Sequence, residues 1–171
     1  MQKESLIIIT VISLLIIFLF LVLAMLKSIS KRIEVKEKEI ISLFLGKINK
    51  IPSLVEIMRK YIRHQDIFEE IIYLHKLWII YNIRSVYDLL DLNDKIHREF
   101  IFLMKLSTKI NELQKDGNFL YVRNYVMFYE KNIEKEISMI DILIRKHNNL
   151  RKLKNYSIIW LLWPVEKRIE F

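Results

Sequence analysis

The residues that most often perform chemistry in proteins are few in this chain and lie far apart in its sequence. The four histidines are His64, His75, His97 and His147. The nearest approach to a metal-ligand spacing is Asp94 with His97, whereas a dinuclear carboxylate site in a helical bundle needs several glutamates and two Glu-x-x-His pairs. We therefore predict no metal, no cofactor and no catalytic residue, and we do not expect an enzyme.

The remaining polar residues also favour structural roles. The chain has 2 glycines and no cysteine, which excludes glycine-rich phosphate loops and thiolate chemistry. His147 is predicted on the apolar face of the last helix, where a core histidine is the expected role. Glu136 interrupts the same face; it either pairs with a base on a facing helix or points outward while Ile137 takes the core position. We favour the second.

One stretch must position everything else. Leu6 to Leu26 contains no charged residue, no proline and no glycine, and Thr10 and Ser13 are its polar residues. At about 1.5 Å per residue it is roughly 30 Å long, the thickness of the hydrocarbon core of a bilayer. It is longer than the apolar region of a signal peptide, and no small-x-small cleavage site follows. We predict a retained transmembrane helix over 6–26, in contact with the lipid bilayer.

The bases beside this stretch predict its orientation. The N-terminal flank, residues 1–5, carries Lys3, whereas the other side carries Lys27, Lys31, Arg32, Lys36 and Lys38. Because the side richer in Lys and Arg stays in the cytoplasm, we expect a single-pass protein of the cell membrane with its N-terminus outside. The net charge of +8 fits anionic lipid or a solvated surface better than nucleic acid, because no nucleic-acid recognition motif accompanies it.

Apolar residues recur every three or four positions from Ile33 to Ile62, which indicates one amphipathic helix after the span. Pro52 lies within it. The continuous phase favours a kinked helix, while Ser53 with Glu56 forms a capping-box pattern that would favour a true break.

Further capping pairs divide the rest of the chain. Asp66 with Glu69 predicts a second helix from Asp66, and a third begins near Ser85 or near Asp94 and runs toward Lys115. Asp116, Gly117 and Asn118 predict a turn. A fourth helix follows, with a near-heptad apolar stripe of the coiled-coil type, listed as Phe119, Val122, Val126, Tyr129, Ile133, Ile140, Leu143, His147 and Leu150.

The predicted fold is therefore all-α: a single N-terminal transmembrane helix followed by an antiparallel, up-and-down-like four-helix bundle over 28–154. An apolar, aromatic tail over 155–171 completes the chain. The tail follows the bases Arg151, Lys152 and Lys154, and its Trp160 and Trp163 suit a membrane surface. The alternative, which we favour, is that its apolar residues cover the open end of the bundle.

Several local patterns occur in order along the chain after the span. Their residues are Ile51, Pro52, Ser53, Leu54, Val55, Glu56, Tyr61, His64, Asn118, Phe119, Glu130, Ile133 and Asn148. These patterns resemble motifs of the LemA family of bacterial membrane-anchored helical proteins, from which Gln65 and Ile137 depart. The resemblance covers about residues 28–171 and implies a helical bundle on one N-terminal anchor, with no established biochemical reaction.

The function that these patterns favour is a non-enzymatic interaction or scaffold module that binds protein partners at the membrane. The alternative is a module that binds or remodels anionic lipid surfaces through the basic last helix and the Trp-containing tail. The sequence sets neither the partner nor the oligomeric state.

Overall fold

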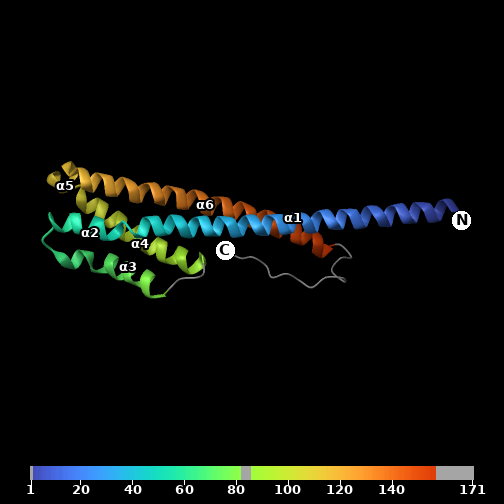
Figure 1. Cartoon of the computed structure of the whole chain (residues 1–171), viewed down its shortest axis with the longest axis horizontal. Helices are drawn as coiled ribbons and strands as arrows, with labels where there is room; N and C mark the ends of the chain where they lie inside the picture. Colours follow the sequence, from blue (N-terminus) through green and yellow to red (C-terminus); the bar gives the residue numbers. More distant parts are fainter. Residues whose placement is uncertain (1, 82–85, 157–171) are drawn as a thin grey trace. The chain divides into compact units, whose positions relative to one another are not determined.

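The computed structural model describes residues 2–81 and 86–156, which are helical with short connections and contain no strand (Figure 1). The chain divides into two compact units. Unit 1 is Met1–Lys36 with Ser138–Phe171, and unit 2 is Glu37–Ile137. The predicted positions of Ser85, Trp160 and Trp163 lie outside the described residues.

The first helix is long and ends just before the proline. Helix α1 spans Gln2–Ile48 and helix α2 spans Ile51–Arg59. Between them, the Lys50 amide donates to the Lys47 carbonyl at 3.0 Å, and the Leu54 amide donates to the Lys50 carbonyl at 3.0 Å. Pro52 thus lies in the first turn of α2, where its missing N–H leaves no intrahelical bond unmade.

The prediction of a continuous, kinked helix through Pro52 is therefore wrong, and the alternative of a break is confirmed. The break is only two residues long. The predicted capping box does not form it, because Lys50 is the N-cap of α2 and makes no side-chain capping bond.

The second predicted helix is present but begins differently. A 3-10 helix, η1, covers Gln65–Phe68 and leads into α3, Glu69–Tyr81. His64 occupies the N-cap with extended backbone angles, φ −76° and ψ 101°. Asp66 lies inside η1, so its predicted role as N-cap is wrong although the start of the helix is placed correctly.

The third predicted helix is split in two. Helix α4 spans Val86–Ser107 and α5 spans Asn111–Lys115, so a start at Asp94 is wrong. Helix α4 ends early: the Ser107 hydroxyl donates to the Met104 carbonyl at 2.7 Å and the Thr108 hydroxyl to the Lys105 carbonyl at 2.8 Å. Such local side-chain bonds offer the backbone an alternative to helix.

The predicted last helix is confirmed, whereas the predicted turn is reduced to Asp116, because Gly117 and Asn118 already belong to the helix. Helix α6 spans Gly117–Tyr156. The Asp116 carboxylate accepts hydrogen bonds from the backbone amides of Asn118 at 2.8 Å and Phe119 at 3.2 Å, which is N-cap geometry. Most of the predicted apolar stripe is buried, with Phe119, Val126, Ile133 and Ile140 each 0% exposed, whereas Tyr129, Leu143 and Leu150 are half-buried.

Within unit 2, helix α3 packs on α2, η1 and α4, and the Phe44 ring meets the Trp78 ring edge-on at 5.0 Å. Three contacts show that α6 runs antiparallel to the segment formed by α1 and α2. Lys47 pairs with Glu130, Lys50 lies 4.9 Å from the centroid of the Tyr125 ring, and Tyr61 bonds to Asp116. The helical pairings are established; the antiparallel four-helix bundle stays a prediction.

Candidate functional site

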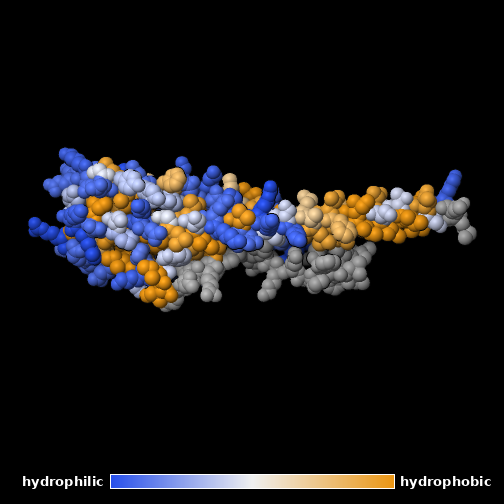
Figure 2. All heavy atoms as spheres, viewed as in Figure 1, coloured by the Kyte–Doolittle hydropathy of each residue, from blue (hydrophilic) through white to orange (hydrophobic). Residues whose placement is uncertain are grey.

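The N-terminal part of α1 exposes apolar side chains on every face. Leu14, Leu15, Ile16 and Ile17 are 61%, 51%, 50% and 56% exposed, although four consecutive helical residues point in four directions about 100° apart. The Thr10 hydroxyl donates to the Leu6 carbonyl at 2.8 Å, so the helix satisfies this polar group with its own backbone. In the described residues this helix is the one long and apolar enough to cross a membrane, and Figure 2 shows its apolar surface.

Unit 2 contains a buried charge cluster where α1, α4 and α6 meet. The Lys47 side chain is 0% exposed; its Nζ donates to Asn93 Oδ1 at 2.8 Å and forms an ion pair with Glu130 Oε2. His97 Nδ1 lies 2.9 Å from Glu130 Oε1. Lys47, Asn93 and Glu130 are buried, whereas the His97 side chain is 34% exposed.

Burial has the largest effect on the charge of Lys47. Burial lowers the pKa of the Lys47 ammonium group, and the adjacent Glu130 carboxylate acts in the opposite direction by favouring the charged form. A buried ion pair is costly to break, because removal of one partner leaves the other charge without compensation. The cluster therefore stabilises the packing of α1, α4 and α6 in unit 2.

A cavity of about 470 Å³ opens beside this cluster. His97 and Glu130 lie on its wall next to apolar side chains that include Phe100 and Met104. Gln114 Nε2 donates to the Ser107 hydroxyl at 3.1 Å on the same wall. Lys47 does not line this cavity, and no cluster in the described part of the chain has the three His, Asp or Glu residues that a metal ion would require.

A second cavity, of about 390 Å³, lies between α2 and α3. Its wall includes Pro52, Val55 and Glu56, residues that carry the family resemblance, together with Arg59 and His75. Burial lowers the pKa of the His75 imidazole, which favours its neutral form. The guanidinium carbon of Arg59 lies 5.8 Å from the centroid of the Phe68 ring.

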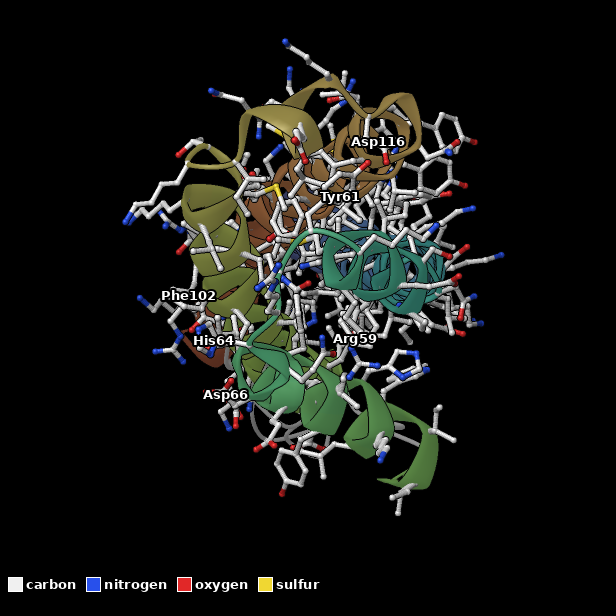
Figure 3. The ribbon with its side chains drawn as sticks, turned by 90° about the vertical axis from the view of Figure 1, so that its left-hand side faces the viewer. Arg59, Tyr61, His64, Asp66, Phe102 and Asp116 are labelled. Atoms are coloured by element: carbon white, nitrogen blue, oxygen red, sulfur yellow. The ribbon has the colours of Figure 1, made fainter. Side chains whose placement is uncertain are left out.

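A hydrogen bond in unit 2 joins the segment that follows α2 to the residue that precedes α6. The Tyr61 hydroxyl donates to Asp116 Oδ2 at 2.9 Å, and Figure 3 shows these two side chains close together. The bond from Tyr61, followed by the bond from the Phe119 amide, lowers the pKa of the Asp116 carboxyl group. The same bond raises the pKa of the Tyr61 hydroxyl. His64, also predicted from the resemblance, is exposed.

The other predicted residues are distributed over core and surface. Ile51, Leu54, Phe119 and Ile133 are buried core residues, and Asn118 and Ser53 lie nearer the surface. His147 is buried as predicted, whereas Glu136 and Ile137 are both half-buried. Of the predicted membrane-surface residues, Arg151 is half-buried and Lys152 is exposed, and the Lys154 side chain lies outside the description.

The sequence analysis did not identify the buried cluster, because it did not consider Lys47. A signal was present. Lys47 follows Phe44 by three residues and precedes Ile51 by four, and it therefore lies on the apolar face of α1. Glu130 occupies the equivalent position between Val126 and Ile133 in α6, but was noted for the resemblance alone.

No protein-family model, curated protein or solved structure matches the chain.

Proposed function

We propose that the chain is a single-pass membrane protein whose helical region is a non-enzymatic interaction module. The observation that carries the proposal is the change of surface along α1. Leu6 to Phe20 expose apolar side chains around the helix, whereas Ile33, Ile40 and Phe44 are buried in a one-sided stripe. The first pattern suits lipid and the second suits a helical core.

The orientation in this proposal is N-terminus outside and unit 2 in the cytoplasm, because the bases that follow the span outnumber the one before it. Unit 2 then carries the surfaces that bind partner proteins. Membership of the LemA family is part of the same proposal, since its layout agrees with a helical region on one anchor. Fusion of a periplasmic-type reporter enzyme and a fluorescent protein to each terminus tests the orientation: fluorescence at the N-terminal fusion would contradict it.

The interaction role is tested by affinity purification of the full chain from detergent-solubilised membranes. The matched control carries the span alone, residues 1–36, with the same tag. We expect the full chain to retain defined proteins that the control does not, and retention of none above this control would contradict the role as an interaction module.

A second candidate function has an observation in its favour: α6 ends in a basic segment, with Lys152 exposed and Arg151 half-buried. Each base near an anionic surface adds about 1 kcal/mol of attraction. Co-sedimentation of the full chain reconstituted in neutral vesicles with added anionic liposomes tests this. If the binding is electrostatic, salt and the double substitution Arg151→Gln/Lys152→Gln should each weaken the tethering of the two kinds of vesicle. Tethering that is unchanged in both cases would exclude electrostatic lipid binding.

A further inference from the structure

Unit 1 contains a groove between α1 and α6 just beyond the predicted span. Its volume is about 580 Å³, within the range of roughly 300–1,000 Å³ typical of binding pockets. The apolar wall combines one residue of α1 with three of α6, listed as Val35, Met139, Ile142 and Leu143. Val35 and Ile142 remain 47% and 50% exposed.

The polar wall of this juxtamembrane groove is basic. Lys31, Arg32 and Lys36 line it together with Ser28, and none of the described lining residues is acidic. Lys36 already interacts with another group of the chain. Lys31 and Arg32 are both exposed and are the bases that we expect to contact a ligand. An apolar floor beside two exposed bases is complementary to a ligand that is apolar on one side and acidic at its edge.

Depth along α1 decides between a lipid and a protein as that ligand. This step rests on the proposed span. From Leu26 to Val35, α1 rises about 13 Å, and an average tilt of about 20° shortens this very little. The interfacial layer extends only about 5–8 Å beyond the hydrocarbon core. The apolar floor therefore lies outside the bilayer, with the bases between it and the membrane.

A phospholipid in its ordinary orientation places its acyl chains on the membrane side of its phosphate. It cannot bring its phosphate to Lys31 and Arg32 while its chains fill a floor farther from the membrane. An amphipathic helix has no such constraint, because its apolar stripe and its flanking acids run side by side along its axis.

We propose that the juxtamembrane groove binds an acidic amphipathic helix of a partner protein, whose apolar stripe covers Val35 and Ile142 and whose carboxylates pair with Lys31 and Arg32. The proposal deepens the interaction role by stating the chemistry of the partner. A second copy of this chain fits less well, because a symmetric pairing of this face would bring the same bases together.

The test uses the full chain in nanodiscs of neutral phosphatidylcholine and two labelled synthetic peptides. Both are about five helical turns long with leucine at i, i+3, i+4 and i+7, and the stripe is flanked by glutamate in one and by lysine in the other. Fluorescence anisotropy should show saturable binding of the glutamate peptide, at least about tenfold tighter than the lysine peptide. Equal binding of both peptides, or no saturable binding, would overturn the proposal.

Two variants locate the binding. Lys31→Glu/Arg32→Glu should weaken binding of the glutamate peptide by at least about tenfold, whereas Lys105→Glu/Lys109→Glu makes the same change of net charge at exposed positions of unit 2 and should leave it unchanged. An equal loss in both variants would overturn the proposal. A photo-crosslinker placed at Ile142 gives a second check in the presence of the glutamate peptide. Reaction with lipid or with a second copy of the chain, instead of with the peptide, would also overturn the proposal.

The same samples separate this proposal from the proposed function. Resistance to alkaline extraction from membranes reports the span. If the chain resists extraction but binds no peptide, only the groove proposal fails; if it is extracted, the depth argument and the membrane function fail together.

Discussion

Two parts of helix α1 share the same backbone geometry but differ in which side chains they expose and bury. The first part, Leu6–Leu26, has no charged residue, and from Leu6 to Phe20 it exposes apolar side chains around its circumference. The second, Ile33–Ile48, buries one face and places a charged group, Lys47, within it. Lipid requires a helix without unpaired charge, whereas a protein core accepts a charge when other helices supply its partners.

The largest effect is expected from charge placed in the first part. Ile12→Arg/Ile16→Arg puts two guanidinium groups near the middle of the span, at a cost of about 2.5–3.5 kcal/mol each. We expect the double variant to be released by alkaline carbonate, which leaves the unmodified chain in the membrane pellet. Val35→Arg, the same chemical change on the same helix beyond the span, is the control and should stay in the pellet.

Removal of the partner charge from the second part should have the next largest effect. Glu130→Gln leaves Lys47 buried without its carboxylate and should lower the free energy of unfolding by about 3–5 kcal/mol. Denaturant titration followed by circular dichroism measures this. Glu70→Gln, at an exposed position of α3, should change little.

The double variant Lys47→Met/Glu130→Leu sharpens this point. If the cost of Glu130→Gln comes from an uncompensated charge, replacement of both partners by apolar residues should restore most of the lost stability. A double variant as unstable as Glu130→Gln would instead indicate that the contacts of Glu130 with His97 carry the stability.

A smaller effect is expected at Gly46 of α1, which faces Tyr129 of α6. A Cβ atom added at Gly46 would overlap the Tyr129 ring, so Gly46→Ala should cost about 1 kcal/mol or more through overpacking. With Tyr129→Ala already present, Gly46→Ala should instead stabilise by about 0.5–1 kcal/mol, because alanine favours helix over glycine. A double-mutant cycle measures the difference, and the same sign in both backgrounds would refute the close approach.

The smallest effect concerns the Tyr61–Asp116 bond and depends on pH. The folded-state pKa of Asp116 is lowered from 3.8, mainly by Tyr61. This linkage stabilises the fold above pH 3.8 and is lost as the pH falls through the folded-state pKa. Tyr61→Phe should thus lower the thermal midpoint by a few degrees at neutral pH, and the difference should shrink in acid. Tyr73→Phe, an exposed control, should show no such pH-dependent difference.

The sequence predicted the elements that depend on local pattern. The long apolar N-terminal helix follows from hydropathy, and α6 follows from the seven-residue spacing of Phe119, Val126 and Ile133, which are all buried. The turn at Asp116 follows from a carboxylate placed to accept two backbone amides. Each of these signals lies within a few turns of chain and needs no knowledge of distant contacts.

The elements that were missed depend on competition or on contacts between distant residues. Helix α4 ends at Ser107 because two hydroxyls bond to nearby carbonyls, although apolar spacing continues beyond it. Asp66 is not an N-cap because a 3-10 turn begins before it. The charge cluster required Asn93, His97 and Glu130 to converge on Lys47, and no local pattern fixes that convergence.

The most direct test of the account asks whether lipid surrounds the first part of α1. Because the chain has no cysteine, single cysteines can be introduced at Leu14, Leu15, Ile16 and Ile17, which together cover all faces of the helix. A water-soluble maleimide should leave all four cysteines unlabelled in intact membranes. When the membranes are opened so that the reagent reaches both sides, it should label a cysteine at Lys31 or Val35. Labelling on one face of the 14–17 segment would contradict a membrane span and place that face in water.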